Sequence, residues 1–260
     1  GLDLPMIIDG KEVRTGNLLD IRPPHDHQHL LGHYHQGGKE HVQMAIEAAL
    51  KAKPAWECMS WESRAAIFLK AADLMSGPYR QSLNAVTMLG QGKNVYQSEI
   101  DAVGELIDFY RYNVKNMYDL YAMQPNSSDG IWNRMVWRPL EGFIFALTPF
   151  NFTAIAGNLG GAPALMGNTV VWKPSKTAVY AAHLVMTILQ EAGLPDGVMN
   201  LVYVSGPDAS EVVLNDENFA GIHFTGSTRV FDGMWEKIAK NVPKYKSYPR
   251  IVGETGGKDY

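Results

Sequence analysis

The chain has 260 residues, of which 46% are hydrophobic and 19% charged, and its formal net charge is −4 at pH 7. A chain of this length and composition buries a substantial core and forms either one large α/β domain or two small ones. The negative net charge argues against a general nucleic-acid-binding protein and against electrostatic binding to membrane surfaces.

The first half of the chain is predicted to be a hairpin followed by helices. Apolar runs flank Asp9-Gly10, which predicts a β-hairpin over residues 6–13. Amphipathic periodicity then predicts three helices, over residues 39–53, 60–76 and roughly 97–122. Turn-forming residues at 125–130 indicate a linker or turn.

After residue 130 the pattern changes to short apolar runs that alternate with helical segments. Strands are expected at residues 134–138, 143–147, 170–172, 199–204, 221–224 and 250–252. Helices are expected at residues 177–191, 207–214 and 227–240. Such alternation implies right-handed crossovers and an α/β fold with a mostly parallel, doubly wound sheet. Ligands bind beyond the carboxyl ends of such strands, so the residues that follow each strand are the candidates for function.

Two of these strand ends carry polar side chains that can bind a ligand. Asn151 could present its amide to a developing oxyanion, or it could cap the next helix; the residue taken alone favours the cap. Lys173 leaves a buried strand and could hydrogen-bond the hydroxyls of a nucleotide ribose, although an isolated Lys-Pro is usually a surface feature.

The last two strand ends carry a glycine turn and an acid. Gly226-Ser227 opens a helix, whose N–H groups and dipole suit a pyrophosphate, although most such turns only cap helices. The chain has no G-x-G-x-x-G motif. If Glu254 is partly desolvated it could activate a water as general base; otherwise it pairs with Lys258 or solvent.

In chain order these features read Pro-x-Asn-Phe, Lys-Pro-Ser, Phe-Thr-Gly-Ser and Gly-Glu-Thr-Gly-Gly-Lys. The set resembles the N-terminal, cofactor-binding part of the aldehyde dehydrogenase superfamily, and the resemblance covers essentially the whole chain. Further stretches resemble the branch that oxidises L-glutamate γ-semialdehyde (1-pyrroline-5-carboxylate) to L-glutamate in proline catabolism. These stretches are residues 68–73, 90–93, 99–102, 150–155 and 162–168.

The resemblance implies a fold, a mechanism and site residues. Residues 1–260 would form an NAD-binding domain, with a hairpin and helical N-terminal segment (1–130) and a Rossmann-like sheet (131–260). In this family a cysteine thiolate attacks the aldehyde, hydride passes to the nicotinamide, and water hydrolyses the thioester. Asn151 would help stabilise the oxyanion, and Glu254 would be the general base for deacylation. The cofactor would contact Thr148, Pro149, Phe150, Lys173, Ser175, Gly206, Gly226 and Ser227. Glu105 would lie near the substrate, although a solvated helix face explains it almost as well.

Two departures from the family pattern matter. Lys176 stands where the family usually has an acid, so NADP is possible, although NAD is expected. No cysteine follows Glu254, so the domain that carries the nucleophile is expected to be absent and the chain inactive alone. Cys58, among tryptophans and a methionine, is predicted to be a buried thiol. Two alternatives stay open: a stand-alone nucleotide-binding module, and an aldehyde dehydrogenase of other substrate preference.

Partners and compartment follow from weaker signals. No apolar stretch approaches the ~20 residues of a membrane span, and the first residues show no secretory signal. A single cysteine excludes an intrachain disulfide framework and favours bacterial cytoplasm or, in a eukaryote, the mitochondrial matrix. The alternating histidines at 25–35 fit surface or strand positions, and no metal is expected. The resemblance implies a small aldehyde substrate and a homo-oligomer of the full-length protein.

Overall fold

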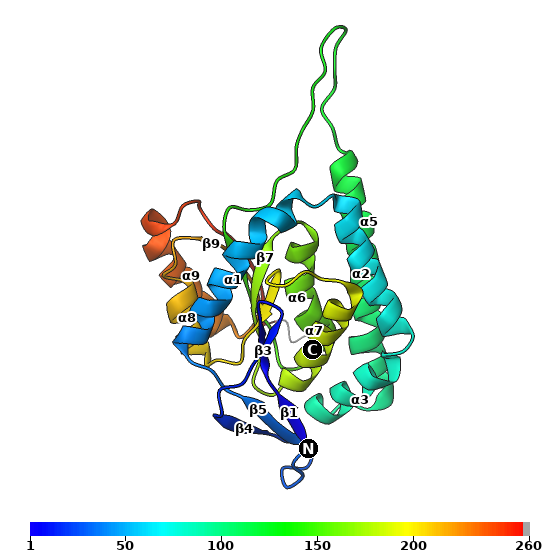
Figure 1. The fold of residues 1–260 in the computed structure, drawn as a ribbon, viewed down its shortest axis with the longest axis vertical. Helices are drawn as coiled ribbons and strands as arrows, with labels where there is room; N and C mark the ends of the chain where they lie inside the picture. The colour runs from blue at the N-terminus through cyan, green and yellow to red at the C-terminus, as the bar shows by residue number, and fades with distance from the viewer. Residues whose placement is uncertain (257–260) are drawn as a thin grey trace.

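The computed structural model describes residues 1–256, and its centre is one seven-stranded sheet (Figure 1). Five parallel strands form most of the sheet: β6 (Phe143–Leu147), β7 (Thr169–Lys173), β8 (Met199–Leu201), β9 (Phe219–Gly226) and β10 (Arg250–Thr255). An antiparallel pair, β2 (Met6–Ile8) and β3 (Lys11–Val13), completes it. The strand order is β10-β9-β6-β7-β8-β2-β3, which confirms the predicted parallel sheet.

The predicted hairpin at the start of the chain is confirmed, and it extends the main sheet. Asp9 and Gly10 have φ of 51° and 73°, the left-handed pair that a two-residue hairpin turn of type I′ requires. A Cβ on Gly10 would lie 1.9 Å from a carboxylate oxygen of Asp196, so both this contact and the positive φ favour glycine here. Ile7 pairs with Leu201 of β8, so the N-terminal segment and the parallel strands share one sheet.

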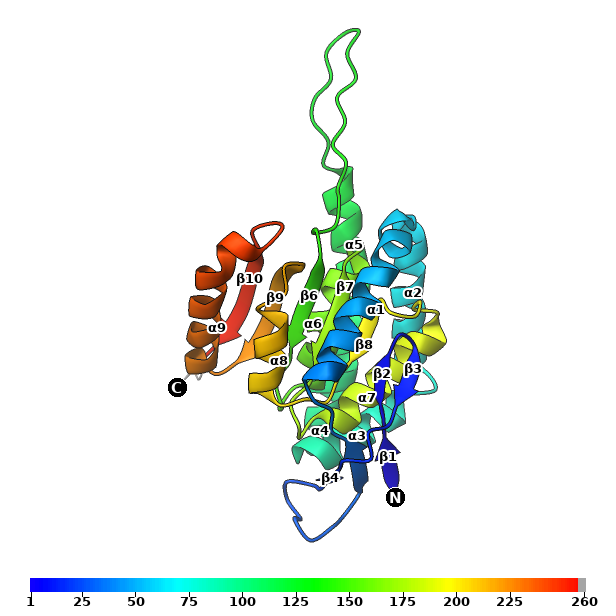
Figure 2. The same ribbon diagram turned by 60° about the vertical axis from the view of Figure 1, so that its left-hand side comes forward.

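Helices cover both faces of the sheet (Figures 1 and 2). On one face lie α1 (Lys39–Cys58), α8 (Gly206–Val213) and α9 (Thr228–Asn241). On the other lie α6 (Thr153–Leu165) and α7 (Val179–Ala192), with α2 (Trp61–Ser76) and α5 (Glu105–Ala122) packed against them. Two shorter helices, α3 (Arg80–Gln91) and α4 (Val95–Ser98), lie in this second layer. A 3₁₀ turn, Val242–Lys244, follows α9. A π-helical segment, Glu99–Gly104, runs directly into α5.

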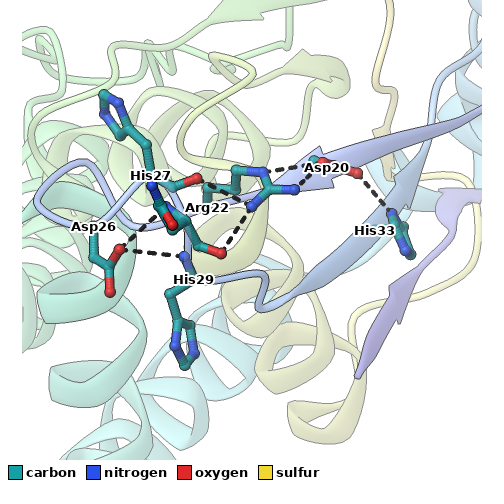
Figure 3. A network of polar contacts seen from close by, with 7 residues as sticks. Asp20, Arg22, Asp26, His27, His29 and His33 are labelled. Atoms are coloured by element: carbon teal, nitrogen blue, oxygen red, sulfur yellow. Dashed lines mark hydrogen bonds and ion pairs between the residues drawn. The ribbon is translucent and has the colours of Figure 1, made fainter.

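A second, three-stranded sheet was not predicted. It consists of β1 (Leu2–Leu4), β4 (Leu18–Ile21) and β5 (Gly32–His35), in the order β1-β5-β4. Arg22 closes the loop between β4 and β5 by donating to Asp20 and to the carbonyls of His27 and Gln28 (Figure 3). Strands this short carry too few residues for a period-two pattern to stand out from the sequence.

Two of the five histidines between residues 25 and 35 lie beside aspartates on strand β5, and the other three are exposed in the loop. His33 and His35 lie on β5, where His35 is buried 2.8 Å from Asp3 and His33 lies 3.1 Å from Asp20. His25, His27 and His29 are exposed in the loop that Arg22 closes. Within residues 1–256 no group of three or more His, Cys, Asp or Glu side chains is arranged to hold a metal ion.

The strand predicted at residues 134–138 is wrong. These residues belong to an exposed arm, residues 123–138, that leaves the end of α5 and returns to β6 (Figure 2). The side-chain amide of Gln124 bridges the arm by accepting from the N–H of Met135 and donating to its carbonyl. A segment with alternating apolar residues forms a strand only where a neighbouring strand supplies its hydrogen bonds. No strand of the described chain pairs with residues 134–138.

Cys58 is exposed, contrary to the prediction of a buried thiol. The helix α1 continues through Pro54 and turns Trp56 inward, where its indole N–H donates to the carbonyl of Ala164 at 2.9 Å. Two residues further along a helix, Cys58 therefore points away from the core. It lines a cavity of about 700 Å³ with Leu140 and Arg250, at the amino ends of β6 and β10.

This exposure predicts that Cys58 reacts without unfolding. We expect one thiol per chain to react with an aromatic disulfide reagent in the native protein, as it does in denaturant. Cys58→Ser, which removes the only thiol, supplies the blank. Reaction only after denaturant is added would contradict the exposed position.

Candidate functional site

The structure brings the predicted site residues to one edge of the sheet. Parallel pairing sets Leu147 of β6 beside Phe224 of β9 and Lys173 of β7. On β10, Glu254 pairs with Thr225. The carboxyl ends of these strands therefore lie side by side, opposite the end from which the arm leaves (Figure 2). The strands that carry the four motifs therefore end at the same edge of the sheet.

One end of this edge contains a cavity of about 430 Å³. Its lining includes Lys173, Ser175 and Gly206, three of the residues that the sequence suggests for a cofactor. Burial lowers the pKa of Lys173 to about 8, and its ammonium group donates to the carbonyl of Pro174 at 2.9 Å. A Cβ added to Gly206 would meet no atom within 4 Å, so this glycine borders open space. The cavity thus combines half-buried donors with open space beside Gly206.

Lys176 and two tyrosines complete this cavity and were not selected as site residues. Lys176 is exposed at the rim, and Tyr34 and Tyr203 form the wall, with their rings 5.6 Å apart in an edge contact. Tyr203 follows β8, so the rule that ligands bind after strand ends could have found it. Tyr34 lies on β5 and had no comparable signal.

At the centre of the edge, Gly226 and Ser227 lead into α9. The hydroxyl of Ser227 accepts from the N–H of Val230 at 3.3 Å, so this side chain caps the helix. A Cβ on Gly226 would come within 2.7 Å of the Phe224 ring, which favours glycine there. The first N–H groups of a helix lack partners within it, and together with its dipole they suit an anion.

The segment between β6 and α6 holds Asn151. Thr148 is buried; its hydroxyl accepts from the indole N–H of Trp172 at 3.0 Å. Pro149 is also buried, whereas Phe150 is 63% exposed. The expectation that Asn151 caps α6 is wrong, because Phe152 takes the cap position and α6 begins at Thr153. The half-buried amide of Asn151 is therefore not committed to the helix end.

Two acids flank the site from different elements. Glu254 is exposed, so the predicted desolvation of this carboxylate is not found in the described chain. Lys258, its alternative partner, lies outside the described residues. Glu105 is half-buried at the start of α5, where burial raises its pKa, helped by the negative charges of Asp101 and Glu254. This burial sets Glu105 apart from a fully solvated helix face.

Sequence reasoning counted residues 90–93, at the end of α3, toward the resemblance but assigned them no role in the site. Lys93, just beyond it, lies 3.0 Å from Asp101 and 3.9 Å from the centre of the Phe152 ring. Thr87 and Gln91 hydrogen-bond the hydroxyl of Thr153 at 2.9 and 2.8 Å. The signal was present, because Gly92 ends α3 in the left-handed conformation that glycine favours.

Comparison with known proteins gives a consistent result. A model described as the aldehyde dehydrogenase family matches residues 12–260. The chain is 54% identical over 259 residues to a delta-1-pyrroline-5-carboxylate dehydrogenase of Agaricus bisporus, covering 99% of this chain and 47% of that protein. For the mitochondrial protein of that name from Danio rerio, the identity is 46% and the coverages are 99% and 46%. The chain thus spans about half the length of the curated relatives it matches.

Solved structures agree. The delta-pyrroline-5-carboxylate dehydrogenase of Mycobacterium tuberculosis, bound with NAD, superposes with a TM-score of 0.97 at 53% identity, covering 99% of this chain and 48% of that one. A 1-pyrroline-5-carboxylate dehydrogenase from Thermus with bound NAD superposes with a TM-score of 0.93 at 31% identity, covering 100% of this chain and 50% of that one.

Among the described residues, no helix has the length and apolar character needed to cross a membrane.

Proposed function

Because this chain belongs to the aldehyde dehydrogenase family, we propose that it forms the NAD-binding part of an enzyme that oxidises L-glutamate γ-semialdehyde to L-glutamate. One observation carries the proposal: Asn151, Lys173, Gly226-Ser227 and Glu254 lie along a single edge of one sheet. The names of the relatives support the substrate. The shared sheet supports treating the hairpin and helical segment together with the parallel strands as one domain.

The cofactor is assigned to the cavity and the neighbouring helix start. Lys173 and Ser175 would bind the hydroxyls of the adenosine ribose, and the adenine would lie against Gly206. The pyrophosphate would meet Gly226-Ser227 at the start of α9. A bound nicotinamide dinucleotide supplies the hydride acceptor. NAD is the proposed form; the exposed cation of Lys176 in the same cavity would also tolerate the extra phosphate of NADP.

The remaining residues are assigned to the chemistry. Asn151 would donate its amide N–H to the aldehyde oxygen as negative charge develops there. Glu254 would take a proton from the water that hydrolyses the thioester. Thr148, Pro149 and Phe150 would line the nicotinamide side of this centre, and Glu105 would face the substrate.

The attacking thiolate would come from a segment other than these residues. Cys58 lines a cavity at the amino ends of the strands, whereas the site lies at their carboxyl ends. The five residues of β6 alone separate the two edges by roughly 16 Å. No side chain of α1 spans that distance, so Cys58 is not a candidate for the covalent step.

We further propose that the full-length protein acts in a reducing compartment, bacterial cytoplasm or mitochondrial matrix, and forms a homo-oligomer. Support for the matrix comes from relatives in Dictyostelium discoideum and Danio rerio whose names include the word mitochondrial. The single cysteine of the chain is consistent with such a compartment.

A comparison of this chain with the full-length gene product tests the function. We expect the 260-residue chain to form no NADH from glutamate semialdehyde, because no thiolate is available for the covalent step. The full-length product is expected to form NADH, faster with this substrate than with simple aliphatic aldehydes and faster with NAD than with NADP.

Each alternative predicts a different outcome. Nucleotide binding without oxidation of any aldehyde by the full-length product would favour a stand-alone binding module. Faster turnover of aliphatic aldehydes would favour a different substrate. NADH formation by the 260-residue chain, if it persists in Cys58→Ser, would overturn the assignment of the nucleophile.

A further inference from the structure

Lys93 lies in the loop between α3 and α4, beside the segment that carries Asn151. Its ammonium group contacts the carboxylate of Asp101 and the ring of Phe152, at 3.0 and 3.9 Å. Only 13% of the Lys93 side chain and 29% of the Asp101 side chain are exposed. An ion pair shielded from solvent interacts more strongly than an exposed one. A cation over an aromatic face adds a further attraction.

The two partners of Lys93 lead to opposite sides of the site. Phe152 directly follows Asn151 and takes the cap position of α6. Asp101 lies in the π-helical segment, about one turn before Glu105. Such π-helical turns frequently mark functional sites. Lys93 therefore connects the loop that carries the Asn151 amide with the helix that carries Glu105.

Other contacts from α3 hold the same two segments in place. Thr87 and Gln91 bind the hydroxyl of Thr153, which adjoins Phe152. Near the start of α3, Arg80 and Asn84 bind Glu99, the first residue of the π-helical segment. Arg80 also carries a positive charge, but it pairs with Glu99, whereas the charge of Lys93 acts on Glu105. The charged groups that act on Glu105 are Asp101, Lys93 and Glu254, which come from three different elements.

We propose that Lys93 is a positioning residue of this site, holding the Asn151 loop through Phe152 and balancing the negative charge around Glu105. Asp101, which pairs with Lys93 at 3.0 Å, and Glu254 both place negative charge near Glu105, and Lys93 opposes it. Like charges in proximity disfavour ionisation, and a nearby cation favours it. The role in turnover rests on the proposed function, but the contacts of Lys93 with Asp101 and Phe152 do not.

Titration of Glu105 in the 260-residue chain tests the charge relation without any activity. The side-chain carboxyl of Glu105 is followed by carbon NMR, and its signal is assigned with Glu105→Gln. Removing the cation in Lys93→Met is expected to raise the pKa of Glu105. Removing the like charge in Asp101→Asn is expected to lower it. Lys93→Arg keeps the charge and should leave the titration close to that of the unmodified chain.

The opposite signs distinguish a charge relation from simple disruption, because loosening of the segment would shift Glu105 in the same direction in both variants. Lys115→Met is the matched control, since Lys115 lies on α5 but pairs with Asp119 at an exposed position. A Glu105 titration that is unchanged in Lys93→Met, or that shifts alike in Lys93→Met and Asp101→Asn, overturns the proposal.

Turnover by the full-length protein tests the effect on the Asn151 loop. Lys93→Met is expected to lower kcat/KM on the order of tenfold or more, because small displacements of catalytic groups cost rate steeply. Lys93→Arg should recover most of this loss, since guanidinium also pairs with carboxylate and stacks on aromatic rings. No loss in Lys93→Met would overturn the positioning role. If the unmodified protein forms no NADH, the proposed function fails, and the NMR titrations still decide the charge relation.

Discussion

In the full-length protein, Glu254→Gln is expected to slow hydrolysis of the acyl-enzyme by about 10²- to 10⁴-fold and to change hydride transfer much less. The amide has nearly the shape of the carboxylate but cannot take a proton from water. Glu254 pairs with Thr225 at the end of β10. Its negative charge contributes to the raised pKa of Glu105 on α5. Rapid mixing should therefore show an early burst of NADH followed by a slow steady state.

An acid elsewhere on the surface supplies the control for this variant. Glu236 on α9 is exposed and pairs with Lys240, so Glu236→Gln should leave both kinetic phases unchanged. An unchanged steady-state rate in Glu254→Gln, with no accumulated acyl-enzyme, would remove Glu254 from the role of general base. Equal slowing of the burst and the steady state would instead point to a role before hydrolysis.

The parallel strands, and the edge of the sheet at which their carboxyl ends meet, could be predicted because each strand has a local signal in the sequence. Phe143–Leu147 is an unbroken apolar run, and residues 170–172 form another that Lys173 ends. Such runs fit strands buried on both faces of a helix-covered sheet. Once the strands are parallel, the residues after them must meet at one edge, which is why Asn151, Lys173 and Glu254 could be grouped from sequence alone.

The helix α3 and the π-helical segment could not be predicted in this way. Two of the four buried positions of α3 are polar, Asn84 and Thr87, so few apolar residues mark its buried face. The π-helical turn before Glu105 has no separate sequence signature, because the surrounding pattern continues to read as one long helix. Lys93 was missed as a consequence, since its partners are defined only when α3, α6 and this turn are brought together.

Errors about exposure have a common cause, which is that neighbours in sequence do not define neighbours in space. Cys58 lies among aromatic residues along the chain, yet α1 turns Trp56 inward and leaves the thiol outside. Residues 134–138 alternate like a strand but leave the body of the protein in an arm. Glu254 follows an apolar strand start, yet β10 is at the edge of the sheet and this carboxylate is exposed.

Trp172→Ala is expected to lower the free energy of unfolding by about 3 to 5 kcal/mol, a large share of the roughly 5 to 15 kcal/mol that stabilises a typical domain. Trp172 is fully buried in β7, between Ala146 of β6 and Leu201 of β8. Truncation leaves a cavity in the middle of the sheet that its neighbours cannot fill. Urea unfolding followed by circular dichroism measures the change, and a midpoint equal to that of the unmodified chain would contradict the packing.

The hydrogen bond from the Trp172 indole to Thr148 can be separated from this packing. Trp172→Phe keeps most of the ring volume and removes the donor, which is expected to cost roughly 1 kcal/mol. Thr148→Val removes the acceptor and leaves a buried N–H unpaired, at a cost of about 1 to 3 kcal/mol. The double variant should lose less than the sum of the two, because it leaves no unpaired group. A double variant that loses less stability than the sum would show that the Trp172 indole holds Thr148, the first residue after β6, in place. Strictly additive losses would mean that Thr148 is held by its backbone hydrogen bond to Lys173 alone.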